Sequence, residues 1–450
     1  MMSKKSSAGV SRNSLPSTRS SLSVLAVLFS ILAVSSFVVI RTSAQKPATG
    51  TETASAARNA ALIAATNEVL QETSQLRQLP VLRPVQSSAL SRAEIERMIV
   101  ANLDRETTAA DMHASEVTLK RLGLVPANFS LRPLIVRLLT EQVAGYYDPK
   151  EQQFHLADWI DVDGQKPIMA HELTHALQDQ HFNLRRFENW PKGDSDAELA
   201  THALIEGDAT LAMTLYVSSN PARALTFLKS FLAAETSSQE LDKAPRAMRE
   251  TLLFPYQEGL TWTRALYQNG GWSAVSRAFK TLPQSSEQIL HPPKYFIHEA
   301  PLKVSLPDLH PALGPGWRRI ETDVNGEWSF YLILDEFLKS VSTSKQAAAG
   351  WGGDRYATYE SANGQSAYVS LSAWDTVKDA REFFDAYVKR TKLRYVDARV
   401  LSERPTVWTA RTSEGNVTIE LRGNRVLVVE GAPAAANSRA LVRTLWARSL

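Results

Sequence analysis

The sequence contains no cysteine, and this absence excludes disulfide bonds, cysteine-ligated metals and a thiol nucleophile. Any transition metal must therefore be held by histidine and carboxylate side chains. The chain also lacks an excess of charge, because 50 Lys and Arg nearly balance 47 Asp and Glu and leave a net charge of +3. We accordingly expect no nucleic-acid partner. Neither a glycine-rich phosphate loop nor the Gly-x-Ser-x-Gly turn of serine hydrolases is present.

A long apolar run occurs only near the N-terminus, at Leu22–Ile40. Basic side chains precede this run, and small residues follow it at positions 42–44. This order is typical of a secretion signal, although the run is also about long enough to span a bilayer. We therefore predict that residues 1–44 are a signal peptide, with cleavage before Gln45, or a membrane anchor that leaves residues 22–40 as a tether. Either outcome places the rest of the chain outside the cytoplasm, in the periplasm or outside the cell.

The length of 450 residues is large for one hydrophobic core and predicts two or three domains. The composition is that of ordinary globular proteins, with 44% hydrophobic and 22% charged residues. Stretches rich in small residues or in proline mark the boundaries. They divide the chain into a linker at 45–57, a main domain at 58–300, a second linker at 301–316 and a C-terminal domain at 317–450.

The strongest chemical signal is the sequence His-Glu-Leu-Thr-His at 171–175, which lies in the apolar segment 167–182. Pro167 suits the first position of a helix, and residues four apart lie on one helical face. His171 and His175 therefore present two imidazoles to one point, which is half of a tetrahedral zinc site. Glu172 falls where its carboxylate can act as general base on a water at the metal.

A second helix, expected over Asp196–Tyr216, offers the third ligand. Glu198, His202 and Glu206 are four residues apart and follow one face of this helix. We favour Glu206, because the neighbouring Gly207 is costly in a helix unless another backbone, here the helix of the histidine motif, comes close. Two histidines and one glutamate leave an open position for water. Glu198 and His202 remain open as alternatives.

Further polar residues are candidates for roles around the metal. Asp179 and Asp208 could each accept the free N–H of a ligand histidine. A peptidase also needs a donor for the oxyanion, which a tyrosine or histidine from the downstream chain could supply. We expect His291 or Tyr295 in this catalytic role, with Tyr256 as a third candidate.

Upstream of the motif, the sequence predicts a small β-hairpin. Gly145–Lys150 forms a turn flanked by β-forming residues, and Gln153–Ala157 alternates as a strand. An exposed edge strand at this place could hold an extended peptide by backbone hydrogen bonds. His155 is expected at the strand surface rather than at the metal.

The C-terminal region predicts an antiparallel sheet with helices on one face. Four of its tryptophans, Trp351, Trp374, Trp408 and Trp446, are expected in the core. With the mainly helical domain and its hairpin, the chain is therefore expected to belong to the α+β class. Sequence patterns predict strands at 355–360, 367–373, 407–412, 417–421 and 425–430, and helices at 376–390 and 438–449.

The motif region resembles the gluzincins, zinc peptidases that carry HExxH on one helix and a glutamate on the next. The resemblance implies a zincin-like fold for residues 58–300, with His171, His175 and Glu206 as zinc ligands and Glu172 as base. The spacing to the third ligand differs from that in thermolysin, and no Asp lies four residues after Glu206. A wider set of motifs is similar to a family of exported bacterial metallopeptidases without defined substrates. These motifs lie at 141–149, 171–180, 206–209 and 287–292.

We therefore expect zinc-dependent hydrolysis of a peptide or protein substrate outside the cytoplasm. The zinc ion would polarise the scissile carbonyl, and Glu172 would move a proton from water to the leaving amine. Residues before Arg83 are candidates for a propeptide that blocks the cleft. The alternative from another class is a non-catalytic binding or scaffold protein at the cell envelope, zinc-stabilised or metal-free, in which the C-terminal domain carries recognition.

Overall fold

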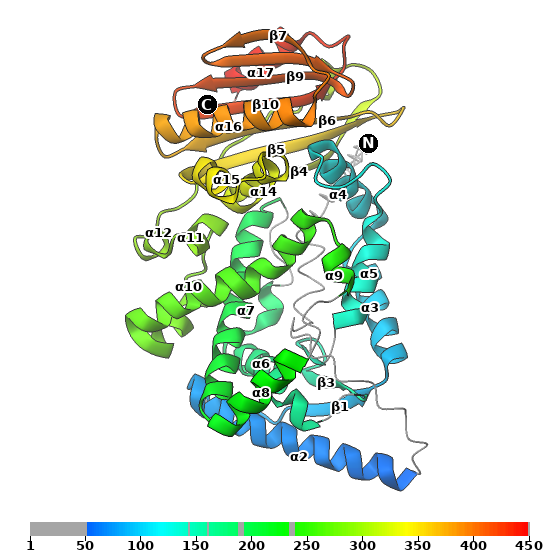
Figure 1. Cartoon of the computed structure of the whole chain (residues 1–450), viewed down its shortest axis with the longest axis vertical. Helices are drawn as coiled ribbons and strands as arrows, with labels where there is room; N and C mark the ends of the chain where they lie inside the picture. The colour runs from blue at the N-terminus through cyan, green and yellow to red at the C-terminus, as the bar shows by residue number, and fades with distance from the viewer. Residues whose placement is uncertain (1–51, 143–144, 160–161, 188–192, 234–238, 449–450) are drawn as a thin grey trace, which may run out of the picture.

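The computed structural model describes residues 52–142, 145–159, 162–187, 193–233 and 239–448. It is a mixed α+β structure, elongated along one axis (Figure 1). Helices and a small sheet occupy one end, and a seven-stranded antiparallel sheet occupies the other. The predicted signal peptide or anchor at 1–44 lies outside the described residues. Within the described residues, no helix is both long and apolar enough to cross a bilayer.

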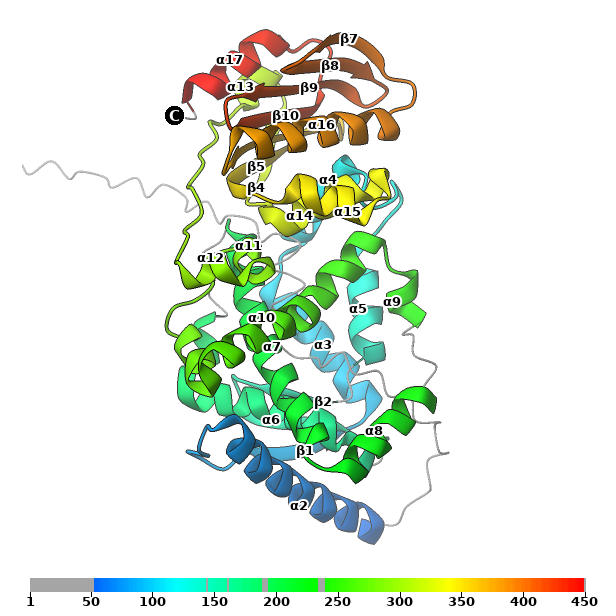
Figure 2. The same cartoon turned by 60° about the vertical axis from the view of Figure 1, so that its left-hand side comes forward.

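The helical end is built around three long helices, α6 (Val162–Phe182), α7 (Ser195–Ser218) and α10 (Arg246–Ala278). α2 (Glu52–Arg77) lies across the outer end and packs against α6 (Figures 1 and 2). The other helices of this end are α3 (Arg92–Glu106), α4 (Ala109–Leu122), α5 (Leu131–Gln142), α8 (Pro221–Ala233), α9 (Gln239–Lys243), α11 (Ser286–Leu290) and α12 (Pro292–Phe296).

Local sequence signals fix the ends of several helices. Ser91 and Glu94 form a capping box at the start of α3, with the Ser91 N–H donating to the Glu94 carboxylate at 2.8 Å. α4 ends at Gly123, whose φ of 73° favours glycine. α2 begins at Glu52, so the helical fold starts inside the predicted linker at 45–57.

The predicted hairpin is confirmed as β2 (Gly145–Asp148) and β3 (Gln153–Ala157), which pair antiparallel. β1 (Gln86–Leu90) adds a parallel strand on the other side of β3 and gives the order β1-β3-β2. β3 is therefore the central strand, and β2 is the edge strand that contacts α6. His155 is buried, so its expected surface position was wrong, and its Nδ1 lies 2.7 Å from the Ser88 hydroxyl.

α7 and α10 cross with their backbones in close contact. A methyl group at Gly207 would lie 2.2 Å from the Gly259 carbonyl oxygen, and one at Gly259 would lie 2.3 Å from the Ala203 oxygen. Only glycine fits at so close an approach. A close backbone at Gly207 was predicted, but the predicted partner was wrong, because the neighbour is α10 and not α6. The crossing holds Tyr256, three residues before Gly259, over the part of α7 that carries Glu206.

The C-terminal sheet is antiparallel throughout, in the order β4-β5-β6-β10-β9-β8-β7. The five predicted strands are confirmed, and the two edge strands β4 and β7 were not predicted. The strands are β4 (Trp317–Asp323), β5 (Trp351–Ser361), β6 (Ser366–Trp374), β7 (Arg399–Arg404), β8 (Val407–Thr412), β9 (Gly415–Arg422) and β10 (Arg425–Ala432).

Helices cover both faces of this sheet, not one face as predicted (Figure 2). Alternate strand residues separate the two layers, since Tyr356 and Tyr368 share a core with α16, whereas Ala357 and Val369 share one with α17. The first face carries α14 (Gly326–Leu338), α15 (Val341–Ala348) and α16 (Val377–Arg394), and the second carries α13 (His310–Leu313) and α17 (Ser438–Arg448). The expected core tryptophans are buried, except that Trp446 is partly buried.

The predicted linker at 301–316 packs along the sheet. The Leu302 N–H donates to the Gly352 carbonyl at 2.7 Å. Leu309 is buried, and its N–H donates to the Tyr359 hydroxyl at 3.0 Å. The segment therefore attaches to β5 on its way into β4.

α4 joins the two ends of the molecule, because it packs on β4, β5 and β6 although it belongs to the N-terminal half. Its last carbonyls accept hydrogen bonds from Arg390 and Arg394 of α16. Arg390 also forms a fully buried ion pair with Glu430 of β10, at 2.6 Å. One hydrophobic core runs without a break from α3 to the sheet, so the two predicted domains share it.

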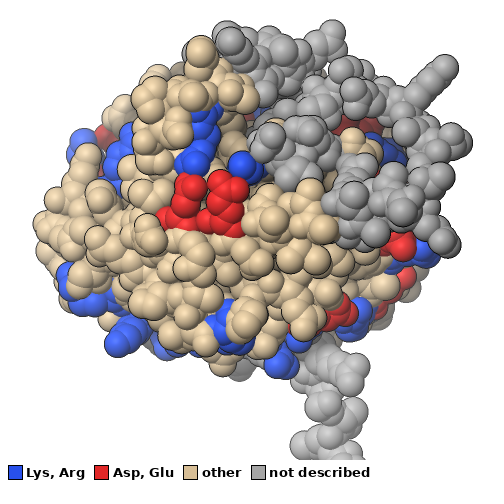
Figure 3. All heavy atoms as spheres, turned by 90° about the horizontal axis from the view of Figure 1, so that it is seen from below, with Lys and Arg blue, Asp and Glu red and all other residues tan. Residues whose placement is uncertain are grey.

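At the outer end of the helical part, a group of acidic side chains lies beside basic ones near the middle of the face, and further charged side chains lie around its rim (Figure 3). α2 contributes Glu68 and Glu72, which pair with Lys166 and Arg223 at 3.4 and 2.8 Å. Partly exposed pairs of this kind contribute at most about 1 kcal/mol each. The apolar face of α2, with Leu62, Val69 and Leu70 packed on α6, therefore provides most of its attachment.

Candidate metal centre

α6 and α7 pack together and bring three side chains to one point. The Nε2 atoms of His171 and His175 lie 3.1 Å apart. Glu206 Oε2 lies 3.0 Å from the first nitrogen and 3.4 Å from the second. The three residues are buried, with 2%, 4% and 3% of their surfaces exposed. The residues predicted as metal ligands therefore converge.

The spacing of these three atoms fits a tetrahedral metal ion. Zinc bonds of about 2.0–2.1 Å at tetrahedral angles separate neighbouring ligand atoms by about 3.3 Å. The observed separations of 3.0, 3.1 and 3.4 Å form a triangle of about that size. Two histidine nitrogens and one carboxylate are also donor types of catalytic zinc sites. The residues present thus fit a zinc ion that keeps a fourth position for water or substrate.

At this cluster, burial and the neighbouring charges shift the pKa values of the side chains in opposite directions. Burial disfavours the charged form of Glu206, but the two histidines outweigh it and lower the pKa of Glu206 to about 2. Burial also disfavours the charged form of His175, but the Glu206 carboxylate outweighs it and raises the pKa of His175 to about 9. Without a cation, a proton on His175 therefore balances the Glu206 charge near neutral pH. A divalent cation would replace that proton, so ion binding would release it to solvent.

Glu172 lies next to the cluster on α6 and is 1% exposed. Its carboxylate lies within 4.8 Å of a ring nitrogen of both histidines. Glu172 Oε2 accepts the backbone N–H of Tyr147 at 2.9 Å. The edge strand β2 thus fixes the carboxylate beside the candidate metal position.

The two alternative ligands on α7 lie in different surroundings. Glu198 is two turns before Glu206, about 12 Å along the helix axis. Burial, with the charges of Asp323 and Asp194, raises the pKa of Glu198 to about 8. His202 is one turn from Glu206, and burial lowers its pKa to about 4 despite that nearby carboxylate. Glu206 is the residue of the three that contacts both ring nitrogens, so a neutral His202 is left in a supporting position.

Tyr256 is the downstream aromatic residue that reaches the cluster. Its ring centre lies 6.1 Å from that of His171. Burial and the charges of Glu206 and Glu172 raise the pKa of the Tyr256 hydroxyl well above its usual range. A hydrogen bond to Glu206 contributes to the same shift. The hydroxyl therefore stays protonated and remains a donor at the candidate metal centre.

His291 and Tyr295, which the sequence favoured for the oxyanion, make other contacts. His291 Nε2 lies 2.9 Å from a carboxylate oxygen of Glu327. The Tyr295 hydroxyl donates to the Thr281 carbonyl at 2.7 Å. Their helices α11 and α12 lie nearer to the seven-stranded sheet than α6 does (Figures 1 and 2). The structure thus directs both side chains into other contacts and leaves Tyr256 as the candidate donor.

A chain of buried polar side chains continues outward from His175. Its Nδ1 lies 2.9 Å from Gln178 Oε1, and the Gln178 amide nitrogen donates to Asp208 at 2.9 Å. Asp208 pairs with Arg77 of α2 at 2.5 Å. Asp208 was predicted next to a ligand histidine, and the structure inserts Gln178 between them. Gln178 carried a sequence signal, since it lies one turn after His175 on the same helix. Nothing local marks Arg77, which lies 131 positions before Asp208.

Asp179, the other residue predicted to accept from a ligand histidine, makes different contacts. It accepts hydrogen bonds from the Tyr147 hydroxyl at 3.0 Å, from Arg83 at 2.7 Å and from the Leu184 N–H at 3.1 Å. These bonds tie the end of α6 to β2 and to the segment before β1. Asp179 therefore supports the elements around the site rather than a ligand histidine.

Comparison with known proteins gives one family match. Residues 315–441 match a family model described as a domain of unknown function (DUF8575). This segment holds the seven-stranded sheet and does not include the candidate metal centre. No curated protein and no solved structure matches the chain.

Ion pairs around the motif at 287–292 connect α11 and α12 to the residue that follows β6 of the sheet. Glu287, Glu299 and Asp375 lie close enough to hold a cation, and all three accept from the Lys294 ammonium at 2.6–2.7 Å. The lysine therefore supplies the positive charge that this group of carboxylates needs.

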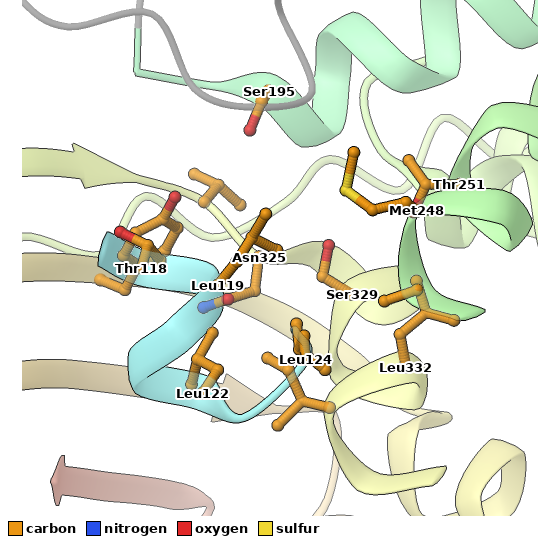
Figure 4. Close-up of a pocket in the computed structure, with 14 residues that line it drawn as sticks. Thr118, Leu119, Leu122, Leu124, Ser195, Met248, Thr251, Asn325, Ser329 and Leu332 are labelled. Atoms are coloured by element: carbon orange, nitrogen blue, oxygen red, sulfur yellow. The ribbon is translucent and has the colours of Figure 1, made fainter. Parts of the chain in front are cut away.

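A separate apolar cavity lies where α4, α10 and α14 meet (Figure 4). Its volume is about 80 Å³, and its walls include Leu119, Met248 and Leu332. A cavity of this size is much smaller than the clefts that hold ligands. It is therefore not a site for a peptide substrate.

Proposed function

We propose that this chain is a zinc-dependent peptidase that acts outside the cytoplasm. The observation that carries the proposal is the triangle of His171 Nε2, His175 Nε2 and Glu206 Oε2, with sides of 3.0–3.4 Å. A general base and a hydroxyl donor, Glu172 and Tyr256, lie beside this triangle. The pair of helices α6 and α7, one with HExxH and the next with the glutamate, supports a gluzincin-like fold for this part of the chain.

Each side chain of the site has a separate role in hydrolysis. A bound zinc ion would polarise the scissile carbonyl and make the attacking water more acidic. Glu172 takes the proton from that water and passes it to the leaving amine nitrogen. The Tyr147 N–H holds the Glu172 carboxylate in place during both transfers. Tyr256, whose raised pKa keeps its proton in place, donates a hydrogen bond to the oxyanion.

The edge strand β2 supports an extended peptide as the substrate. β2 pairs with β3 on one side, pairs with no second strand among the described residues, and contacts α6. A peptide aligned with this edge would gain backbone hydrogen bonds and pass close to Glu172, which already binds the edge at Tyr147. The predicted signal or anchor at 1–44 is the basis for placing this activity outside the cytoplasm.

The test compares the purified chain with its Glu172→Gln variant. Zinc content is measured by atomic emission, and cleavage is measured on an unfolded protein. We expect one zinc per chain in both proteins and a loss of hydrolysis of at least about 10²-fold in the variant. Glu198→Gln, which removes a buried carboxylate two turns from Glu206, is the control and should keep its activity. Equal cleavage by wild type and Glu172→Gln would refute the proposal. Zinc in both with cleavage by neither would support the zinc-stabilised scaffold instead.

A further inference from the structure

The geometry points to Arg77, Asp208 and Gln178 as positioning residues for the metal ligand His175, and we propose that α2 is thereby a permanent part of the metal centre. The inference rests on the proposed function, because it concerns the affinity of the same site for zinc. It assigns a role to a helix that the sequence offered only as part of a blocking segment.

Gln178 is held in one orientation by three hydrogen bonds. Its amide nitrogen donates to the Ile205 carbonyl at 3.0 Å and to Asp208 at 2.9 Å. Because both partners accept, the amide oxygen is the atom that remains for His175 Nδ1, at 2.9 Å. The oxygen requires a proton on Nδ1, and a neutral ring then offers its Nε2 lone pair to the metal. Gln178 thus selects the tautomer that can bind zinc.

Asp208 and Arg77 fix the far end of this chain. The two side chains form two hydrogen bonds, at 2.5 and 3.1 Å, and neither is exposed. The Arg77 guanidinium also lies 4.4 Å from the centre of the Trp272 ring and donates to Ser276 at 3.2 Å. A paired, bidentate arginine is rigid, so Asp208 can hold Gln178 without moving.

The two proposed ligand histidines differ in whether a hydrogen bond to Nδ1 orients the ring. Among the described residues, His171 Nδ1 is buried and has no hydrogen-bond partner. The orientation of His171 depends on packing, for example against the Tyr256 ring. His175 is therefore the ligand whose geometry depends on the buried chain that ends in α2.

The hydrogen-bonded series Gln178–Asp208–Arg77 also links Glu206, the third ligand, to α2, because Asp208 lies two residues after Glu206 on α7. Removing α2 would leave the Asp208 carboxylate buried without its cation, which is strongly unfavourable. A propeptide that ends near Arg83 is therefore incompatible with the intact site.

The test measures zinc affinity in the full chain by competition with a chromophoric chelator, in parallel with the thermal stability of the metal-free protein. Asp208→Asn keeps the shape of the side chain and removes its charge. Gln178→Met removes the hydrogen bond to His175 and leaves the buried charge of Asp208 paired with Arg77. We expect either change to weaken zinc binding by about 10–100-fold.

The matched control is Glu430→Gln, which makes the same carboxylate-to-amide change in another fully buried arginine pair, with Arg390. It should lower the melting temperature as Asp208→Asn does but leave the zinc dissociation constant within about twofold. The inference is overturned if Asp208→Asn and Gln178→Met bind zinc as tightly as wild type, or if Glu430→Gln weakens binding equally. A wild-type chain that binds no zinc would instead contradict the proposed function itself.

Discussion

Replacing Gly207 by alanine tests whether the α7–α10 crossing sets the geometry of the metal centre. The added methyl group would lie 2.2 Å from the Gly259 carbonyl oxygen and 2.7 Å from the Thr263 hydroxyl. Both neighbours belong to α10, and the nearer one is backbone. The clash therefore cannot be relieved by a side-chain rotation, and the two helices must separate.

The size of the effect follows from that distance. An ordinary contact begins near 3.4 Å, so the backbones must move apart by about 1.2 Å. Overpacking of this kind costs about 1–3 kcal/mol of folding stability. Tyr256 moves with α10 and Glu206 moves with α7, and a misplacement of about 1 Å at a reacting centre can lower the rate about 10²-fold. We expect both losses in Gly207→Ala.

The assay combines urea unfolding, which gives the free energy of unfolding, with kcat/KM for peptide hydrolysis and the zinc content. Gly270→Ala is the control, because Gly270 lies in α10 with an extended φ of −166°, and an added methyl group there would meet side-chain atoms alone, the Ala274 methyl group at 3.1 Å and the Arg277 guanidinium at 3.4 Å. The control should change stability and activity little. Unchanged stability and unchanged kcat/KM in Gly207→Ala would refute the reasoning. An equal loss in the control would assign the effect to the glycine itself rather than to the crossing.

Four further outcomes are expected. Tyr256→Phe should lower kcat/KM by about 10–10³-fold with zinc content unchanged, as measured by steady-state kinetics and atomic emission; full activity would remove Tyr256 from the oxyanion role. Removing zinc with a chelator should lower the melting temperature, and adding zinc back should restore it, because an ion that binds only the folded state stabilises the folded state. A melting temperature that does not change with chelator would argue against a bound metal. Arg390→Met should destabilise the chain by up to about 3–5 kcal/mol in urea unfolding, because it removes one of the two arginines that pair with the buried Glu430 and leaves only Arg394 at 3.0 Å, and zinc affinity should not change. Burial raises the pKa of Glu321 to about 8 in the folded protein. Proton binding to Glu321 therefore stabilises the folded state fully below about pH 4.5, and this contribution is lost as the pH rises through 8. The melting temperature should fall between about pH 5 and 9, and it should fall less in Glu321→Gln.

Periodic and local signals explain most of what the sequence predicted correctly. His171 and His175 are one turn apart, so helical spacing brings these two together, but the same spacing left Glu198, His202 and Glu206 on one face of α7 and did not choose between them. The hairpin of β2 and β3 and the strands β5, β6, β8, β9 and β10 carry alternating patterns with clear turns.

Long-range packing explains what the sequence did not predict. β1 pairs in parallel with β3 across 67 positions, as at Gln86 and Gln153, and no turn marks that pairing. Gly207 signalled a close backbone but could not say which, since α6 and α10 both pack on α7. The sequence favoured His291 and Tyr295 over Tyr256 as donors, whereas the crossing of α7 and α10 places Tyr256 at the candidate metal centre. Arg77 lies at the end of an ordinary helix, and its partner Asp208 is a distant residue.

The docking of α4 has a consequence for how the C-terminal region can be exchanged or excised. The matched segment, 315–441, is continuous in the chain, but the unit that folds with it is discontinuous and includes residues 109–122. A fragment cut at the family boundaries would leave two guanidinium groups, those of Arg390 and Arg394, without the carbonyls that now receive them. Gene fusion or recombination that moved this region to another protein would therefore have to bring a substitute for that helix, or evolve one on the recipient.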